Sequence, residues 1–227
     1  MFKKILPFAL LFAINLFAFQ SRFLPSYNIS INCSQILHKM ALDICYSCQW
    51  KTPEMVVYKI NGNLLNGKHF SRKHLYFRPD YQLPTKCRSY SKDYSRTGFD
   101  RGHLAPNGAF NYSRKLQKET FLMSNIAPQR PKLNRRLWSK IERFVRMQAR
   151  RYGNVRVITG VCGSMGHIKH GVNIPSYWYK IIFRPDGKVI SFLAPNINRG
   201  MTRARAKEFL TDVGTIEKTC GFEIKKQ

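Results

Sequence analysis

The 227-residue chain is long enough for one domain with a sizeable core, and no internal repeat, low-complexity tract or linker divides it. Its 39 basic residues outnumber its 12 acidic residues and give a net charge of +27. Such an excess destabilises a compact fold by self-repulsion, so it usually serves a polyanionic partner. Nucleic acid is the first candidate, because neutralised phosphates release condensed counterions. An anionic membrane surface is an alternative, whereas clustered arginines disfavour a merely lysine-rich composition.

The first 18 residues have the features of a secretory signal peptide. Lys3 and Lys4 precede an apolar run from Ile5 to Ala18, which is shorter than the about 20 residues that a transmembrane helix needs. We therefore predict cleavage after Ala18, a secreted or periplasmic protein, and no stable membrane association afterwards. Cleavage would leave 37 basic and 12 acidic residues, a net charge of +25. An uncleaved membrane anchor is the alternative.

All six cysteines lie beyond this segment, at Cys33, Cys45, Cys48, Cys87, Cys162 and Cys220. An even number of cysteines in an exported chain favours disulfides over metal thiolates, but the sequence does not choose the pairing. Cys45 and Cys48 have redox-motif spacing, yet no thioredoxin-like strand and helix flank them, so we predict a structural role. Residues 19–50 are predicted to form an N-terminal arm stapled to the main domain, residues 51–227.

Residues 19–98 contain two predicted elements of regular structure. Residues 34–44 have helical spacing of apolar residues, with Ser34 as a possible cap. A strand is predicted over residues 55–60, where the turn dipeptide Asn61-Gly62 follows. Residues 61–98 are rich in Asn, Gly, Pro, Ser and Tyr, so we expect a long irregular excursion there.

Beyond residue 98, predicted helices and strands alternate irregularly. A short helix is predicted over residues 113–121 and a strand over residues 121–126, and the clearest helix covers residues 133–152 up to Gly153. The remaining predicted elements are a strand over 154–160, a hairpin of 177–183 and 188–193, and a final helix over 202–213. Hairpins interleaved with helices, without regular β-α-β alternation, predict an α+β fold with a mostly antiparallel sheet and flanking helices.

Residues 98–142 contain the side chains that a metal-assisted phosphodiesterase needs. His103 is the natural general base, because imidazole titrates near neutral pH, and Arg101 can bind phosphate or stabilise the transition state. A hard cation such as Mg²⁺ needs few protein ligands, and Asn134 and Glu142 can supply oxygens. Eight helical residues rise about 12 Å, so we expect Glu142 to act through a water while Asn134 binds directly.

Each of these residues also has a structural interpretation. Asn134 could cap its helix, and Glu142 could form an ion pair with Arg146, one turn along the same side. Asp100 could orient Arg101 or shape a turn, and the sequence does not decide between them.

Two features outside the 98–142 stretch are weaker. His167 and His170, with Cys162 nearby, have loose zinc-site spacing, but histidines of a glycine-rich loop are the better description. The basic residues of the 133–152 helix include Arg135 and Arg136; a solvated face is the usual role of such residues, and nucleic-acid contact is the alternative.

Residues 97–146 resemble the DNA/RNA non-specific endonuclease family of the ββα-metal superfamily in three ordered motifs. The D-R-G-H signature corresponds to residues 100–103, the S-N-[IV]-x-P-Q stretch to residues 124–129, and the L-N-x(3)-W-x(3)-E pattern to residues 133–142. Gly108, after the signature, is a mild departure. The resemblance implies a ββα-metal active site and a Mg²⁺-dependent endonuclease, with Mn²⁺ possible, that cuts DNA and RNA with little sequence preference and leaves 5′-phosphate ends.

The resemblance also implies a role for each motif residue. Catalytic roles fall on His103 as the base, Arg101 as the transition-state cation, Asp100, Asn125 as a supporting amide, and Glu142. Asn134 would bind Mg²⁺ directly and Glu142 through water. Substrate contacts are expected from Arg146, Arg135 and Arg136.

A second hypothesis is a cationic nucleic-acid-binding or DNA-capture protein at the cell surface that has lost cleavage. The intact base, cation and ligand positions argue against it. A membrane-disrupting protein is a third, disfavoured because no predicted helix pairs a clean apolar face with charges suited to lying in a bilayer.

Overall fold

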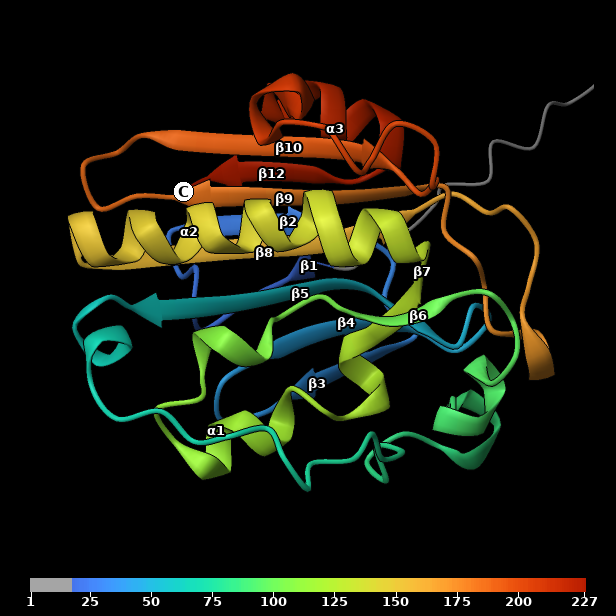
Figure 1. The fold of residues 1–227 in the computed structure, drawn as a ribbon. Helices are drawn as coiled ribbons and strands as arrows, with labels where there is room; N and C mark the ends of the chain where they lie inside the picture. The colour runs from blue at the N-terminus through green and yellow to red at the C-terminus, as the bar shows by residue number, and fades with distance from the viewer. Residues whose placement is uncertain (1–17) are drawn as a thin grey trace, which may run out of the picture.

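A seven-stranded antiparallel sheet forms the main layer of the computed structural model, which describes residues 18–227 (Figure 1). Its strands, in spatial order, are β11 (Leu210–Thr211), β10 (Val189–Pro195), β9 (Tyr177–Phe183), β8 (Asn154–Cys162), β5 (Thr52–Asn61), β4 (Asp43–Ser47) and β3 (Gln35–His38). The predicted α+β fold with a mostly antiparallel sheet is confirmed. The predicted signal peptide, residues 1–18, lies outside the described residues except for Ala18, which begins β1.

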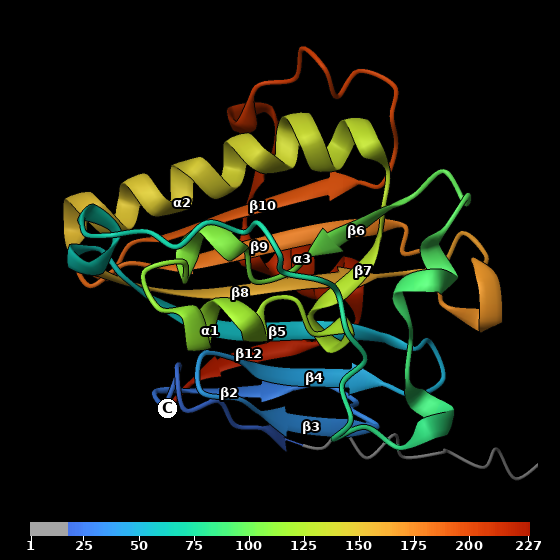
Figure 2. The same cartoon turned by 60° about the horizontal axis from the view of Figure 1, so that its bottom comes forward.

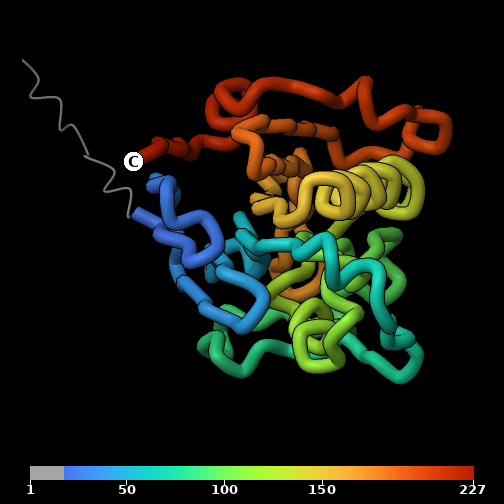
Figure 3. Tube along the Cα trace, turned by 90° about the vertical axis from the view of Figure 1, so that its left-hand side faces the viewer, coloured from blue at the N-terminus to red at the C-terminus, as the bar shows by residue number. Residues whose placement is uncertain are grey.

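The two faces of the main sheet carry different layers. Helix α2 (Ser139–Tyr152) covers one face, where Ile141 and Val145 join the same buried cluster as Tyr58 and Ile182 of the sheet. The other face is covered by a three-stranded sheet and a helix, namely β1 (Ala18–Phe19), β2 (Tyr27–Ser30), β12 (Glu223–Lys226) and α3 (Val213–Cys220). Figure 3 shows both ends of the described chain on this second side, away from α2.

A small hairpin and the helix after it form the predicted ββα unit. Strand β6 (Asp100–His103) pairs antiparallel with β7 (Ile126–Gln129), so that His103 faces Ile126 in the register. A π-helical turn, η6 (Leu133–Trp138), then leads directly into α2. Figure 2 shows the hairpin beside the N-terminal end of α2. Helix α1 (Arg114–Glu119) lies between the two strands in sequence, as predicted.

Short 3₁₀ turns account for much of the remaining chain. They are η1 (Asn63–Asn66), η2 (Thr85–Cys87), η3 (Ser91–Tyr94), η4 (Asn107–Ala109), η5 (Met123–Asn125), η7 (Lys169–Gly171) and η8 (Ala206–Phe209). Three of them lie in residues 61–98, where no α-helix and, beyond the end of β5, no strand forms, so the irregular excursion is confirmed.

The helix predicted over residues 34–44 is wrong, because this segment is the β3–β4 hairpin. Two residues of the expected apolar helix face, Ile36 and Met40, are exposed, whereas Leu42 is buried. The buried residues Leu37, Ala41 and Ile44 come from β3, the turn and β4, and their spacing in the sequence happens to match one face of a helix. Residues 19–50, expected to form a separate arm, therefore contribute two strands to the main sheet.

Two other predicted elements are displaced. The strand expected over residues 121–126 is the 3₁₀ turn η5 followed by β7, which begins at Ile126 and includes Pro128. The helix expected over residues 202–213 is wrong: η8 and β11 occupy its second half, and the helix α3 begins only at Val213. Asp212 fixes that start, because its carboxylate accepts the Thr215 backbone N–H at 2.7 Å.

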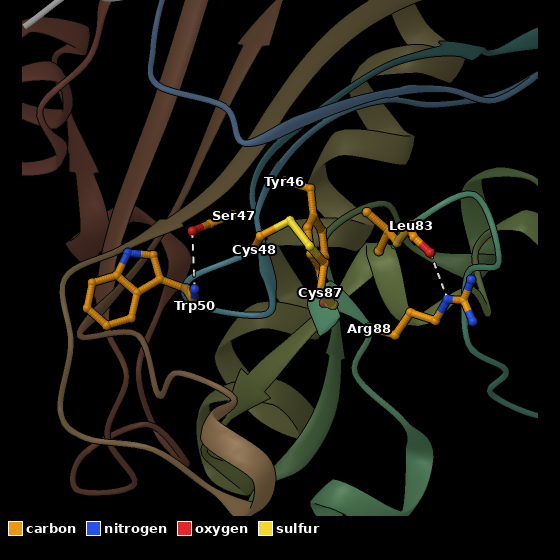
Figure 4. The surroundings of a disulfide bond; sticks show 7 residues. All are labelled: Tyr46, Ser47, Cys48, Trp50, Leu83, Cys87 and Arg88. Atoms are coloured by element: carbon orange, nitrogen blue, oxygen red, sulfur yellow. Dashed lines mark hydrogen bonds between the residues drawn. A yellow bond between two sulfur atoms is a disulfide. The ribbon is translucent and has the colours of Figure 1, made fainter. Parts of the chain in front are cut away.

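Three disulfides connect the layers: Cys33–Cys45, Cys48–Cys87 and Cys162–Cys220. Cys45 and Cys48 thus belong to different bridges, which confirms their structural role. At Cys48–Cys87 the main sheet is tied to the irregular segment, and the Tyr46 hydroxyl also donates to the Cys87 carbonyl at 2.9 Å (Figure 4). Across residues 18–227, no helix has the length and apolarity needed to cross a membrane.

Candidate active site

A cavity of about 420 Å³ lies where the β6–β7 hairpin, η6 and the first turns of α2 meet. It is lined by Arg72, Phe77, Phe99, Asp100, Arg101, His103, Pro106, Asn107, Gly108, Asn134, Ser139, Glu142 and Arg146. Six of the nine predicted site residues are therefore brought together: Asp100, Arg101, His103, Asn134, Glu142 and Arg146. The ring of His103 and the amide of Asn134 share one cleft, as the sequence hypothesis requires.

His103 is held as a neutral imidazole between aromatic rings. The ring centroids of Phe77 and Phe121 each lie 5.3 Å from the centroid of the imidazole. Burial, together with the nearby Arg72 guanidinium, lowers the pKa of His103 to about 3, because both disfavour the imidazolium. Its Nε2 is buried without a hydrogen-bond partner among residues 18–227, which leaves Nδ1 as the candidate nitrogen for proton uptake.

Close packing explains the glycine in the signature. A Cβ on Gly102 would lie 2.5 Å from the Gln129 side-chain oxygen and 2.8 Å from the Trp178 ring. Any other residue at this position would therefore push β6 away from β7 and the core. The side chains of Arg101 and His103, on either side of Gly102, keep their places in the cavity wall because the strand packs so tightly.

Asp100 fixes the orientation of the Asn134 amide. The Asn134 Nδ2 donates to Asp100 Oδ2 at 2.9 Å, and Arg135 donates two hydrogen bonds to the same carboxylate, from Nε at 2.8 Å and from Nη2 at 2.6 Å. An ionised carboxylate only accepts hydrogen bonds, so the amide nitrogen must face Asp100 and the amide oxygen must face elsewhere. Of the two roles considered for Asp100, neither orienting Arg101 nor shaping a turn describes these contacts.

The π-helical turn also contributes to the placement of Asn134. It is inserted before α2, at the N-terminal end of the helix, and it carries both Asn134 and the buried Trp138. Wider turns of this kind are rare and are frequently found at functional sites. The sequence predicted one regular helix here, since helical periodicity does not distinguish a π turn from an α turn. Trp138, predicted to be a core residue, is fully buried.

Glu142 lines the cavity without any ion pair or side-chain hydrogen bond of standard geometry among the described residues. Burial raises its pKa, and the positive charges of Lys180 and Arg146 offset this shift only in part. Beside Arg146, Gly108 leaves room: a Cβ there would lie 3.4 Å from the Arg146 guanidinium. Gly108, the position that departs mildly from the family pattern, therefore lies close to Arg146, which is predicted to bind phosphate.

Lys180 is a fully buried lysine beneath the cavity that the sequence analysis missed. Its Nζ donates to the Tyr58 hydroxyl at 3.0 Å, to the Leu104 carbonyl at 3.4 Å and to the Thr159 hydroxyl. Burial lowers the pKa of Lys180, whereas Glu142 acts in the opposite direction. One signal in the sequence could have revealed it, since a lone cation interrupts the otherwise apolar strand of residues 177–183.

Arg101 is anchored at the cavity wall by backbone and aromatic contacts. Its Nη2 donates to the Ser91 carbonyl at 2.6 Å, and its guanidinium lies 5.7 Å and 5.8 Å from the ring centroids of Phe77 and Tyr94. Its Nε is buried without a partner. The irregular segment before the signature thus holds the arginine in place.

Asn125, predicted to be a supporting active-site amide, lies behind the site. Its oxygen accepts the Ala105 N–H at 2.9 Å, and its nitrogen donates to the carbonyls of Ala105 at 2.9 Å and Thr120 at 3.0 Å. The residue is fully buried and absent from the cavity wall. These contacts make it a clamp for the loop that follows His103.

The predicted substrate-binding arginines separate into three environments. Arg146 lines the cavity, Arg135 is exposed and paired with Asp100, and Arg136 is exposed outside the cavity. Arg72 lines the mouth of the cavity and lies over the Phe121 ring at 5.5 Å, although the sequence analysis did not single it out. It belongs to an irregular segment with several cations, where no pattern distinguishes one arginine from another.

The weak zinc-site hypothesis is not supported by the contacts of its residues. His170 Nδ1 bonds to Asp93 at 2.7 Å, the His167 ring stacks on Trp50 at 5.8 Å, and Cys162 is in a disulfide. The glycine-rich loop description of these histidines therefore holds.

We expect an NMR titration to find the His103 imidazole neutral down to about pH 4. Arg72→Ala should raise its midpoint, because the repelling guanidinium is removed. The unfolded chain has a histidine pKa of about 6.5 and binds this proton first, so the free energy of unfolding should fall as pH drops from about 6.5 toward 3. A midpoint near 6.5 in the folded protein would contradict the buried environment described above.

Comparison with known proteins places this geometry in a family. The profile of the DNA/RNA non-specific endonuclease family matches residues 22–227. A solved structure of an EndoG/EndoGI complex, reported with the mechanism of EndoG inhibition, superposes with a TM-score of 0.76 at 25% identity, covering 85% of this chain and 86% of that chain.

Three curated relatives agree with this match. The mitochondrial nuclease of Saccharomyces cerevisiae is 28% identical over 209 residues, covering 79% of this chain and 62% of that protein. Human mitochondrial endonuclease G is 28% identical over 208 residues, covering 83% and 69%. Nuclease C1 of Cunninghamella echinulata var. echinulata is 33% identical over 179 residues, covering 70% of each.

The chain thus spans between 62% and 70% of the length of these three relatives. The family match, by contrast, covers nearly the whole described chain and includes the cavity with its ββα unit. The chain belongs to the DNA/RNA non-specific endonuclease family.

Proposed function

We propose that this protein is an exported, Mg²⁺-dependent endonuclease that hydrolyses phosphodiester bonds in DNA and RNA. The observation that carries the proposal is the convergence of three groups on one cavity. These are the neutral imidazole of His103, the Asn134 amide turned by Asp100, and the unpaired carboxylate of Glu142.

The oxygen groups of the cavity fit a hard divalent cation. Asn134 Oδ1 is the amide atom that Asp100 leaves free, and Glu142 has no partner among the described residues, so it can accept hydrogen bonds from metal-bound water. When bound, Mg²⁺ supplies Lewis-acid stabilisation of the leaving oxygen, and Mn²⁺ has similar ligand preferences. Asp100 would not bind the ion itself. It orients the amide of Asn134, and Arg135 holds Asp100 in place.

His103 serves as the general base in this proposal. Nδ1 takes a proton from water, the water oxygen bonds to phosphorus, and the bond from phosphorus to the 3′ oxygen breaks. The 3′ oxygen gains a proton, so the products carry a 5′-phosphate and a 3′-hydroxyl. The cations at the cavity wall, Arg72, Arg101 and Arg146, are placed to bind phosphate oxygens as charge accumulates.

Phosphate contacts also account for the proposed low sequence preference, because phosphates carry no sequence information directly. The net charge of +27 supports a polyanionic substrate of either sugar type. Three disulfides within the described residues support passage through an oxidising compartment, in keeping with the predicted signal peptide. The competing hypothesis, a non-cleaving protein that captures DNA at the cell surface, predicts binding without hydrolysis.

His103→Ala should lower the rate of plasmid and RNA cleavage by about 10²-fold or more, because the proton acceptor is lost. Nucleic-acid binding in a gel-shift assay should persist, and chelation of divalent cations should stop cleavage by the wild type. His69→Ala is the matched control, because His69 is exposed and lies outside the residues that line the cavity. A wild-type protein that binds plasmid but never nicks it with Mg²⁺ would instead establish the capture hypothesis.

Asp100→Asn should raise the Mg²⁺ concentration for half-maximal cleavage by roughly 10- to 100-fold, because the ligand amide loses its fixed orientation. Arg135→Ala is the control, since it removes a partner of the same carboxylate but keeps the bond from Asn134. Its Mg²⁺ requirement should change much less. Equal requirements in the two variants would refute the orienting role of Asp100.

A further inference from the structure

Two of the twelve carboxylates differ from the others in their hydrogen bonds and ion pairs. All twelve lie within residues 18–227, and ten accept a hydrogen bond or form an ion pair, at Asp43, Asp80, Asp93, Asp100, Glu119, Asp186, Glu208, Asp212, Glu217 and Glu223. The remaining two, Glu142 and Glu54, have no such partner of standard geometry in the described chain, and each lines a cavity. Glu142 belongs to the candidate active site. Glu54 belongs to a different cavity.

The second cavity has a volume of about 250 Å³ and lies on the opposite side of the main sheet from α2. Two of its lining residues, Tyr179 and Phe222, belong to the core cluster of that opposite face. Trp50, Thr52, Glu54 and Asn173 complete the part of its wall that could recognise a ligand. The sheet thus separates this cavity from His103.

Backbone irregularities place Glu54 at the cavity. The register of β4 and β5 shifts at this point, with Cys45 opposite Met55 and Tyr46 opposite Pro53, so Glu54 is the extra residue of a β-bulge. Bulges commonly redirect a side chain. On the neighbouring strand, a Cβ on Gly160 would lie 2.1 Å from the Tyr179 ring, so only glycine lets this ring lie across the strand toward Glu54.

The electrostatic surroundings of Glu54 favour a positively charged ligand. Burial raises the pKa of Glu54 to about 7, and the Ser47 hydroxyl offsets this shift only in part. No basic side chain of the described region contributes to that pKa, although the chain carries 39 of them. The Glu54 side chain is partly exposed, so an incoming cation could reach its carboxylate and would stabilise the ionised form.

Asn173 supplies a second unpaired acceptor. Its Nδ2 donates to the Gly163 carbonyl at 3.0 Å, which fixes the amide because a carbonyl oxygen only accepts. Its Oδ1 is left buried without a hydrogen-bond partner, and the residue is only 3% exposed. A buried amide oxygen without a donor among the described residues is uncommon, and Asn173 is one of the residues that line the cavity.

Three aromatic side chains also line the cavity, those of Trp50, Tyr179 and Phe222. Tyr179 and Phe222 stack at 5.2 Å between ring centroids, and Trp50 stacks on His167 at 5.8 Å. The Trp50 backbone N–H is held by the Ser47 hydroxyl at 3.2 Å, and Figure 4 shows its indole turned away from the Cys48–Cys87 disulfide. Aromatic faces attract cations and pack against alkyl groups.

We propose that this cavity binds a small organic cation, with an ammonium or guanidinium group that donates to Glu54 and to Asn173 Oδ1 while its alkyl part packs on the aromatic wall. A metal ion fits less well, because hard cations need about six or more oxygen ligands and the cavity offers one carboxylate among aromatic rings. The described residues also contain no cluster of three or more His, Cys, Asp or Glu side chains that could hold a metal. A volume of about 250 Å³ is several times that of one water, which suits a small organic molecule.

Calorimetric titration of the full-length protein with agmatine and with putrescine, without nucleic acid or divalent cations, tests this proposal. We expect saturable binding that Glu54→Gln weakens by at least about tenfold, since a hydrogen-bonded charge pair is lost. Glu223→Gln removes the same charge from an exposed pair with Lys225 and should leave binding unchanged. Plasmid cleavage by Glu54→Gln should equal that of the wild type, which verifies folding independently.

Trp50→Leu is the second variant, since it removes an aromatic wall without touching the carboxylate. It should also weaken binding of both amines. Titration of the wild type should change its tryptophan emission, and the change can be assigned to Trp50 because Trp138 and Trp178 are buried elsewhere in the core. No saturable binding to the wild type, or equal affinity in Glu54→Gln and wild type, would overturn the proposal. So would saturable, Glu54-dependent binding of Ca²⁺ without binding of either amine.

Discussion

The hydrogen bond from Asn134 to Asp100 is the contact on which the candidate site depends. It joins the first residue of β6 to the turn before α2, and two hydrogen bonds from Arg135 to the same carboxylate reinforce the connection. Because the carboxylate can only accept, the bond also determines which atom of the amide is free. Arg135 pairs with Asp100 at the surface, so this geometry places no unpaired negative charge beside the amide of Asn134, the proposed metal ligand. The position of Asn134 Oδ1 thus follows from the way in which β6 and η6 meet.

The rest of the cavity is organised by charge and burial. Aromatic rings around His103 keep its imidazole neutral, and buried Lys180 supplies a positive charge beneath Glu142 from the centre of the main sheet. Lys180 also donates to the Leu104 carbonyl, directly after His103, so it connects the sheet to the segment that carries the proposed base. Glu142 and Glu54, the two carboxylates of residues 18–227 without an ion pair or a hydrogen bond of standard geometry, line cavities on opposite sides of the sheet.

Much of this site could be predicted from the sequence because its residues are local. Asp100, Arg101 and His103 are neighbours, and Asn134 and Glu142 share one helical run, so spacing alone places them near each other. What could not be predicted depends on tertiary contacts. Lys180 and Arg72 come from distant segments, the bond from Asn134 to Asp100 requires the hairpin and the turn to meet, and the full use of Asn125 by backbone groups has no signature in its motif. The fold shows the same division. The amphipathic helix and the hairpin of β9 and β10 were predicted correctly, whereas the β3–β4 hairpin was mistaken for a helix because its buried residues have helical spacing.

The location of the metal ion is the most direct test of this account. A crystal structure of the His103→Ala variant with Mn²⁺ in place of Mg²⁺ would reveal the ion by its anomalous scattering. The account predicts one peak at about 2.1 Å from Asn134 Oδ1, the distance expected for a small hard cation, with Nδ2 still bonded to Asp100. A peak elsewhere in the cavity, or an Asn134 amide turned away from Asp100 in the bound state, would contradict it.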